Sequence, residues 1–342
     1  MSFDYRQKIP EVKEVLETMP LSAELKRVKE ERDEEIIAVF KRESDKFLLI
    51  IGPCSADNEN AVCEYVSRLA KLQDEVREKL LLIPRIYTNK PRTTGEGYKG
   101  MAHQPKPTEE PNMVKGLKAI RKMHIRAMKE SHLTAADEML YPGNYPYLED
   151  ILSYVAVGAR SVENQLHRLT ISGLDVPSGM KNPTSGDLEV MLNSVFAAQM
   201  PHIFVYNGWE VKTTGNPYAH CIVRGAVDQY GTNIPNFHYE DLMRLSEAYK
   251  KRNLQYPTII VDTNHANSNK KFYEQPRIAK EIMRSRQLSK TLRNKVRGLM
   301  IESYLVEGSQ KISENVYGKS ITDACLGWED SERLVRELME YV

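Results

Sequence analysis

The feature that most constrains the fold is a regular alternation of short apolar runs with longer amphipathic stretches, which begins near residue 46. The runs are apolar along their whole length, as expected of strands that are covered on both faces. The stretches between them, such as residues 60–79 and 187–200, have helical periodicity. Strand–helix alternation predicts a parallel sheet, and eight such units predict an α/β fold of the closed (β/α)8 (TIM) barrel type. The eight runs lie at residues 46–55, 79–88, 133–139, 153–161, 176–182, 202–208, 258–267 and 296–305.

The first 45 residues stand outside this alternation. Residues 1–45 are rich in charged side chains and predict an N-terminal extension with one helix, which leads into a catalytic barrel of residues 46–342. Pro20 interrupts the helical pattern, because the residue before a proline avoids the α region. Ser22 is placed to cap the helix that follows.

A second region interrupts the alternation after the sixth run. Residues 208–225 contain two short apolar segments on either side of Gly215-Asn216-Pro217, a typical turn sequence. We therefore expect a β-hairpin here, inserted into the barrel loop that follows strand six.

Composition disfavours several classes of protein. The 342 residues carry a formal net charge of +1, whereas a general nucleic-acid binder is usually more basic. The longest apolar runs are strand-sized, well short of the ~18 residues that span a membrane. The four cysteines form no CxxC pair, which disfavours a zinc ribbon or a disulfide framework. Because the N-terminus also lacks a signal-peptide pattern, we expect a soluble cytoplasmic protein with reduced thiols.

Four potential metal ligands follow runs one, seven and eight. Barrel active sites form at the carboxyl ends of the strands, and these three strands are neighbours in a closed barrel. Each residue alone has an ordinary structural explanation, for example as a buried small cysteine or a capping carboxylate. Together, a thiolate, an imidazole and two carboxylates predict a site for one divalent metal, Mn, Fe, Co or Zn rather than Ca or Mg. The four residues are Cys54, His265, Glu302 and Asp323.

Six cationic side chains end or follow the runs and are predicted to line the same barrel mouth. Arginine matches phosphate and carboxylate oxygens with its planar fork, and lysine adds point charge. Some of the six are alternatively ordinary surface charges, but the set exceeds what one monophosphate needs. We expect two anion sites, one for a phosphate-plus-carboxylate substrate and one for a sugar phosphate. The sequence has no Walker motif, no GxGxxG directly after the first strand and no GxSxG elbow, so nucleotide, dinucleotide and serine-hydrolase functions have no support. The cations are Arg85, Lys90, Arg92, Arg160, Lys181 and Arg224.

Several strings of residues, spread over positions 45 to 335, resemble the class I 3-deoxy-D-arabino-heptulosonate 7-phosphate (DAHP) synthases. The resemblance implies a (β/α)8 barrel and a transferase that joins phosphoenolpyruvate (PEP) to erythrose 4-phosphate and releases phosphate, the first step of the shikimate pathway. The strings are IGPCS (51–55), PRIYTNKPRTT (84–94), GARSVENQLHR (158–168), GMKNPTSG (179–186), HCIVRG (220–225), DTNHANSNK (262–270), MIESYLVEG (300–308) and YGKSITDACLGWED (317–330).

The same resemblance implies roles for individual residues. The metal ligands are Cys54, His265, Glu302 and Asp323. The PEP-binding residues are Arg85, Lys90, Ala159, Arg160, Lys181 and Arg224. The residues that bind erythrose 4-phosphate are Pro91, Arg92 and Thr93. Catalytic roles fall to Lys90, Glu138 and His265. Lys90, Glu138 and a water at the metal remain alternatives for the individual proton transfers.

The sequence departs from well-known feedback-regulated members at Asn207-Gly208-Trp209, where those members carry Thr-Lys-x-Gly after strand six. In the family, the hairpin and the N-terminal extension contribute to an inhibitor site and to subunit contacts. We therefore expect an aromatic amino-acid feedback inhibitor, of unspecified identity, and a homodimer or homotetramer, with no nucleic-acid or membrane partner.

Two alternatives share the barrel. A 3-deoxy-octulosonate 8-phosphate synthase, which uses arabinose 5-phosphate, is disfavoured by the KPRTT string at residues 90–94 and by the extension. A non-catalytic phosphate-binding barrel is disfavoured because every implied ligand and cation is in place.

Overall fold

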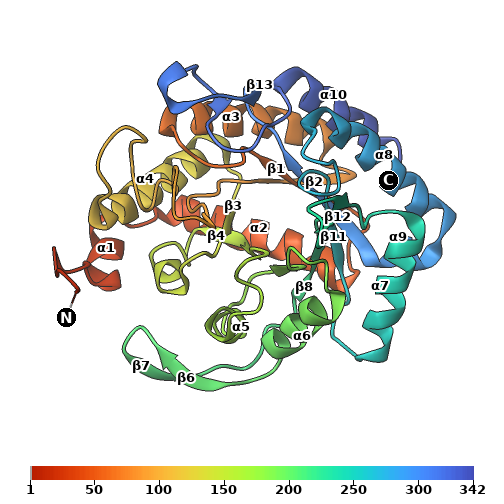
Figure 1. The fold of residues 1–342 in the computed structure, drawn as a ribbon, viewed down its shortest axis with the longest axis horizontal. Coiled ribbons are helices and arrows are strands. Elements are labelled where there is room, and N and C mark those ends of the chain that lie inside the picture. Colours follow the sequence, from red (N-terminus) through yellow and green to blue (C-terminus); the bar gives the residue numbers. More distant parts are fainter. Residues whose placement is uncertain (1) are drawn as a thin grey trace.

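The computed structural model describes residues 2–342 and contains a closed barrel of eight parallel strands (Figure 1). The hydrogen-bonded order is β2-β1-β12-β11-β8-β5-β4-β3, and a parallel bridge between Arg85 and Ala136 joins the two ends. This confirms the predicted (β/α)8 fold. The strands are β1 (Phe47–Gly52), β2 (Leu80–Pro84), β3 (Ala135–Glu138), β4 (Leu152–Val157), β5 (Ser178–Lys181), β8 (Ala219–Val223), β11 (Ile259–Asp262) and β12 (Val296–Glu302).

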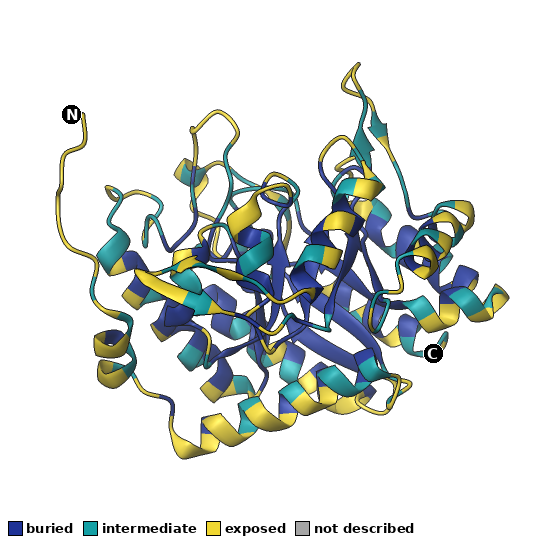
Figure 2. Cartoon of the chain, turned by 90° about the horizontal axis from the view of Figure 1, so that it is seen from below, coloured by how far each residue is buried: buried dark blue, intermediate teal, exposed yellow. Residues whose placement is uncertain are grey.

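Helices surround the barrel and bury the outward face of its strands (Figure 2). Several begin at side-chain caps: Asn58, Asn112 and Asp187 each accept hydrogen bonds from backbone amides of the first turn. In residues 2–342, no helix is long and apolar enough to cross a membrane. The surrounding helices are α3 (Glu59–Val76), α4 (Met113–Ser131), α5 (Gln165–Ile171), α6 (Leu188–Gln199), α7 (Tyr239–Lys251), α8 (Gln275–Leu288), α9 (Lys290–Lys295) and α10 (Trp328–Met339).

Short elements lie in the connections. They are the 3-10 helices η1 (Pro142–Tyr147), η2 (Phe272–Glu274) and η3 (Ile312–Glu314), and the two-stranded pairs β9 (Ala226–Val227) with β10 (Asn233–Ile234) and β13 (Val306–Ser309) with β14 (Lys319–Ser320).

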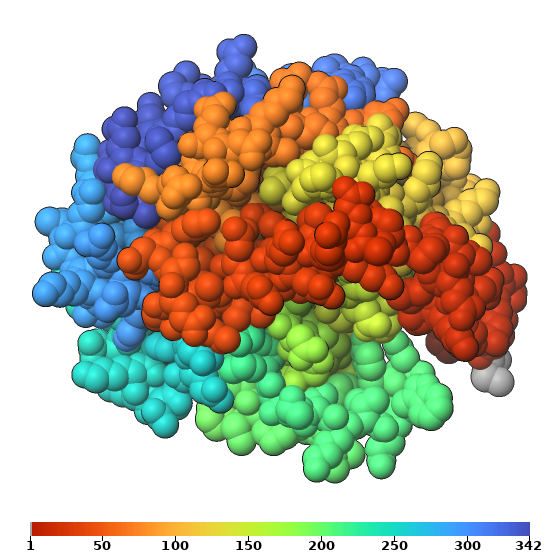
Figure 3. Space-filling view, turned by 180° about the vertical axis from the view of Figure 1, so that it is seen from behind, coloured from red at the N-terminus to blue at the C-terminus, as the bar shows by residue number. Residues whose placement is uncertain are grey.

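The N-terminal segment contains two helices rather than the single helix expected, α1 (Val12–Thr18) and α2 (Ala23–Lys41). Figure 3 shows this segment crossing the back of the barrel. The side chain of Ser22 accepts a hydrogen bond from the Leu25 amide, as predicted. Ile36, Val39 and Phe40 pack into the barrel interior, so α2 belongs to the core of the barrel. The interior residues of this cluster are Leu48, Ile50, Leu81, Ile83, Tyr87, Ala136, Tyr154, Ala156, Ile222, Ile260 and Met300.

The hairpin insertion exists, but its predicted position at 208–225 is wrong. Strands β6 (Ile203–Tyr206) and β7 (Trp209–Lys212) pair antiparallel around Asn207-Gly208, where φ is 49° and 81°. Positive φ at both central residues is what a two-residue turn of this kind requires, and Asn-Gly is its strongest sequence signal. The run at 202–208 is therefore half of a hairpin outside the barrel.

The sixth barrel strand is instead β8, which follows the hairpin. All five of its residues are buried, whereas β6 alternates between exposed and half-buried positions. Gly215-Asn216-Pro217 leads into β8 and turns no hairpin; the Asn216 side chain donates to the Val176 carbonyl at 3.0 Å. Asn207 consequently lies at the hairpin tip beside η1 and does not end a barrel strand.

Candidate active site

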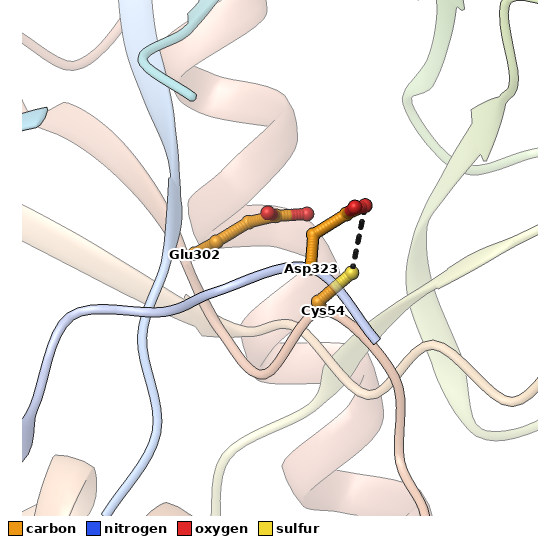
Figure 4. Close-up of side chains that lie close together, drawn as sticks. All are labelled: Cys54, Glu302 and Asp323. Atoms are coloured by element: carbon orange, nitrogen blue, oxygen red, sulfur yellow. Dashed lines mark hydrogen bonds between the residues drawn. The ribbon is translucent and has the colours of Figure 1, made fainter. Parts of the chain in front are cut away.

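Three of the four predicted metal ligands converge at the carboxyl ends of the strands (Figure 4). Cys54 follows β1, Glu302 ends β12, and Asp323 follows β14; one ligand atom from each lies within 4.8 Å of the others. The Sγ atom of Cys54 is 3.3 Å from Oδ2 of Asp323. One thiol and two carboxylates at this spacing fit a single divalent transition metal.

The fourth predicted ligand, His265, lies beside this group and not within it. Its Nε2 atom is 3.9 Å from Oε1 of Glu302, and its Nδ1 atom is 2.9 Å from Oδ2 of Asp262. Its Nε2 atom thus faces one of the three grouped residues, Glu302.

Buried partners hold Glu302 in its charged form. Glu302 is fully buried, Arg85 donates to its Oε1 at 2.7 Å, and Asn264 donates to its Oε2 at 2.6 Å. Burial opposes ionisation, but the charges of Arg85, His265 and Lys90 outweigh it and lower the pKa of the Glu302 carboxyl. Glu302 therefore contributes a negative charge beside Cys54 and Asp323.

The thiol of Cys54, unlike the Glu302 carboxyl, is held in its protonated form. Burial, with Glu302 as the next contribution, raises the pKa of its thiol to about 12. The ammonium of Lys90 lies 2.6 Å from the sulfur and partly offsets the effect. A metal ion that binds here must displace the thiol proton, so binding releases a proton.

A cavity of about 190 Å³ opens next to the ligand group and is lined by most of the predicted substrate-binding residues. A larger groove of about 800 Å³, between the start of α3 and residues 310–321, contains none of the predicted site residues. The smaller cavity is therefore the place for chemistry. Thr93 is exposed and lies outside its lining. The predicted residues that do line it are Arg85, Lys90, Pro91, Arg92, Glu138, Ala159, Arg160, Lys181, Arg224, His265 and Asp323.

Arg85 is held so that one donor remains free. Its Nε atom donates to the Pro53 carbonyl at 3.2 Å, Nη2 donates to Glu302, and the guanidinium stacks on the Tyr87 ring at 3.9 Å. Its buried Nη1 atom has no hydrogen-bond partner among residues 2–342, and the same is true of Nη1 of Arg224. Two buried, unpaired N–H donors at one cavity call for an anionic ligand, because an unsatisfied buried donor is costly.

Glu138 and Lys181 lie next to each other in the cavity lining. The Lys181 ammonium is 4.0 Å from Oε2 of Glu138 and 3.4 Å from Oδ2 of Asp262. Gly158 makes room for the Glu138 carboxylate, since a methyl group there would lie 2.5 Å from its Oε1 atom. The acid predicted near the substrate is thus in reach of the same ligand as the lysine.

Four further residues that shape this site were not predicted from the sequence. Asp262, Asn264 and Tyr87 hold predicted site residues in place, and Lys270 lines the cavity rim. Asp262 and Asn264 could have been found from the sequence, because both are polar residues at the end of run seven, close to His265. Tyr87 gave no signal, because an aromatic residue in an apolar run is usually part of the core.

Fold and site together define a barrel enzyme whose mouth is arranged for a divalent cation and multiply charged anions. The sequence profile of the DAHP synthetase I family matches residues 24–336. The chain is 34% identical over 336 residues to the phospho-2-dehydro-3-deoxyheptonate aldolase of Haemophilus influenzae, covering 96% of this chain and 90% of that protein. It is 35% identical over 349 residues to the Phe-sensitive enzyme of the same name from Escherichia coli K12, covering 98% and 96%.

A solved structure agrees. The phospho-2-dehydro-3-deoxyheptonate aldolase of Francisella tularensis superposes with a TM-score of 0.92 at 29% identity, covering 100% of this chain and 98% of that one. The chain belongs to the DAHP synthetase I family. Its enzymatic class is that of the DAHP synthases, transferases that condense PEP with erythrose 4-phosphate in aromatic amino-acid biosynthesis.

Proposed function

We propose that this protein performs a metal-dependent condensation of PEP with D-erythrose 4-phosphate, giving DAHP and inorganic phosphate. The observation that carries the proposal is the convergence of Cys54, Glu302 and Asp323 beside a cavity with two buried, unpaired arginine donors. The metal is proposed to be Mn, Fe, Co or Zn, held by these three residues and His265. When bound, it supplies Lewis-acid polarisation of the aldehyde.

The residues of the chain position the first substrate. Arg85, Arg224 and Lys181, with Arg160 at the rim, are proposed to bind the carboxylate and phosphate of PEP. Because Arg85 is already fixed by Pro53, Glu302 and Tyr87, PEP meets a donor that needs no rearrangement. Positioning of this kind supplies a large share of the rate in two-substrate reactions. Pro91, Arg92 and Thr93 are proposed to hold the second phosphate.

Carbon 3 of PEP attacks the aldehyde carbon of erythrose 4-phosphate, and positive charge develops at carbon 2. Water adds at carbon 2, and phosphate leaves from the resulting hemiketal. Lys90, half-buried beside the ligand group, is placed to give a proton to the new alkoxide. Glu138, 4.0 Å from Lys181, is placed to take a proton from the attacking water.

The test is an assay of metal-stripped protein with PEP and erythrose 4-phosphate, with and without added Mn²⁺. We expect PEP loss and phosphate release only when metal and both substrates are present. Turnover with arabinose 5-phosphate in place of erythrose 4-phosphate would point to the octulosonate synthase. No turnover with any metal would contradict the proposal.

An aromatic amino acid is proposed to inhibit the enzyme. Relatives at 34–36% identity are named Phe-sensitive, Tyr-sensitive and Trp-sensitive, so the family supports this type of control without fixing the effector. Phe, Tyr and Trp in parallel wells of the same assay identify it. A homodimer or homotetramer is proposed to support this control, and sedimentation of the purified protein measures the oligomeric state.

A further inference from the structure

Asp262 is a buried carboxylate that the reaction outlined above does not use. It ends β11 at the carboxyl end of the barrel and is fully buried. Its Oδ1 atom accepts a hydrogen bond from the backbone N–H of Asn264 at 3.0 Å. The side chain of Asn267 donates to the backbone carbonyl of Asp262 at 2.8 Å. The side chain is therefore fixed on one side by its own loop.

The other oxygen of Asp262 faces two proposed site residues at once. Oδ2 lies 2.9 Å from Nδ1 of His265 and 3.4 Å from the ammonium of Lys181. His265 points its second nitrogen toward Glu302 at 3.9 Å, and Lys181 points toward Glu138. One carboxylate oxygen thus connects the proposed metal side of the site with the proposed PEP side.

This contact favours one chemical form of the imidazole. Nδ1 and Oδ2 are close but not aligned as a hydrogen bond in the structure, and both are buried without another hydrogen-bond partner among residues 2–342. A carboxylate accepts a proton donor, so an oxygen at Nδ1 favours the tautomer with hydrogen on Nδ1 and a free lone pair on Nε2. A histidine needs that lone pair to ligate a metal, and carboxylates commonly set it from the far side of the ring. His265 also has an unusual backbone, with φ of 52°, so its loop depends on such contacts to hold the ring.

We propose that Asp262 is a positioning residue that fixes the tautomer of His265 and the ammonium of Lys181, so that metal affinity and PEP affinity depend on one carboxylate. This inference rests on the proposed metal and PEP sites. An amide cannot replace the carboxylate, because both oxygens face donors: the Asn264 amide on one side, and His265 and Lys181 on the other. In Asp262→Asn, one oxygen is replaced by an NH₂ group, which is itself a donor. Whichever way the new side-chain amide is turned, this NH₂ group faces either the Asn264 backbone N–H or the His265 and Lys181 side chains.

Binding measurements on metal-free protein test the proposal without turnover. Mn²⁺ affinity is measured by electron paramagnetic resonance and PEP affinity by calorimetry. We expect Asp262→Asn to weaken Mn²⁺ and PEP binding by about tenfold or more each, in line with other carboxylates behind ligating histidines. Lys181→Met should weaken PEP binding but leave Mn²⁺ affinity within about twofold, because the contact between Asp262 and His265 persists.

A matched control separates positioning from loss of a buried ion pair. Arg121 is fully buried and donates to both oxygens of Asp150, at 2.7 and 2.9 Å, outside the cavity lining. Asp150→Asn should lower the melting temperature but leave both affinities unchanged. If Asp262→Asn behaves like Asp150→Asn, the proposal is wrong, even if wild-type turnover establishes the synthase.

A second measurement does not require the variant to fold. In ¹⁵N-histidine-labelled wild-type protein, the signals of His265 are assigned by their loss in His265→Gln. We expect hydrogen on Nδ1 and a bare Nε2, with Nε2 shifting when Zn²⁺ is added. Hydrogen on Nε2 in the metal-free protein would overturn the proposal. Failure of wild-type protein to bind any metal would instead contradict the proposed function.

Discussion

The two ends of the barrel share one wall of strands but have opposite interiors. At the amino-terminal end, apolar side chains such as Leu48 and Leu81 fill the interior and α2 covers them. At the carboxyl end, the interior positions carry Arg85, Lys181 and Glu302, and loops surround an open cavity. The difference teaches that one end supplies stability and the other supplies chemistry, as is general for this fold. The two ends should therefore respond separately to substitution.

The largest expected effect is at the carboxyl end. Cys54→Ala removes a proposed metal ligand, and losing a Lewis acid that contributes several kcal/mol lowers turnover about a thousandfold or more. The barrel should remain folded, because alanine fits the buried site. Calorimetric Mn²⁺ titration, an activity assay and thermal melting measure the three quantities. Full activity in Cys54→Ala would contradict the metal assignment.

The complementary substitution breaks the covered end. Phe40 is fully buried, and its ring lies 4.8 Å from that of His220. Phe40→Ala should lower the free energy of unfolding by about 3–5 kcal/mol, the usual range for a buried aromatic ring. PEP affinity should be unchanged in the folded fraction. Phe3→Ala is the control, since Phe3 is 81% exposed and its loss should not affect denaturant unfolding. Equal effects of the two substitutions would show that α2 does not seal the barrel.

A smaller effect is expected on the pH dependence of stability, and it comes from a histidine in the barrel interior. His220 is buried in the interior, accepts a hydrogen bond from the Tyr154 hydroxyl at 2.6 Å and contacts the Tyr218 carbonyl at 2.9 Å. Burial lowers the pKa of its imidazole from 6.5 to about 4. The neutral form is therefore favoured in the folded state, and its contribution to stability is complete above pH 6.5. As the pH falls from 6.5 toward 4, the unfolded chain gains a proton that the folded chain does not. The free energy of unfolding therefore falls by about 3 kcal/mol over this range.

Urea unfolding at several pH values measures this loss. His220→Leu should remove that part of the slope between pH 6.5 and 4. Tyr154→Phe keeps the imidazole buried, so it should lower stability but retain the slope. An unchanged slope in His220→Leu would assign the acid sensitivity to other groups.

Much of the barrel was predictable because its strands are apolar on both faces. Strands β1 and β12 are buried at every residue, and their runs are visible in the sequence. The sixth strand was misplaced for a physical reason. β8 is short, follows a proline and contains His220, whose polar ring is paired with the Tyr154 hydroxyl and the Tyr218 carbonyl. The exposed hairpin just before it offered a more apolar run.

The residues that line the site were also predictable from the sequence, but the contacts between them were not. Parallel strands deliver their last residues to one end, so Cys54, Glu302 and the cations could be grouped from sequence alone. The partners of each residue could not. The contact of Asp262 with both His265 and Lys181 depends on a loop in which His265, Asn269 and Lys270 all have positive φ. No local pattern predicts such a path, because it is imposed by the tertiary contacts around it.

The place of α2 in the chain has a consequence for biosynthesis. Its apolar residues Ile36, Val39 and Phe40 leave the ribosome early, whereas Ile260 and Met300, which belong to the same apolar cluster, are made near the end. Until β12 is complete, the face of α2 that covers the barrel has no finished surface to cover. The nascent chain therefore exposes these apolar residues of an otherwise charged helix through most of its synthesis, and a fragment that stops before β12 should bind chaperones or aggregate.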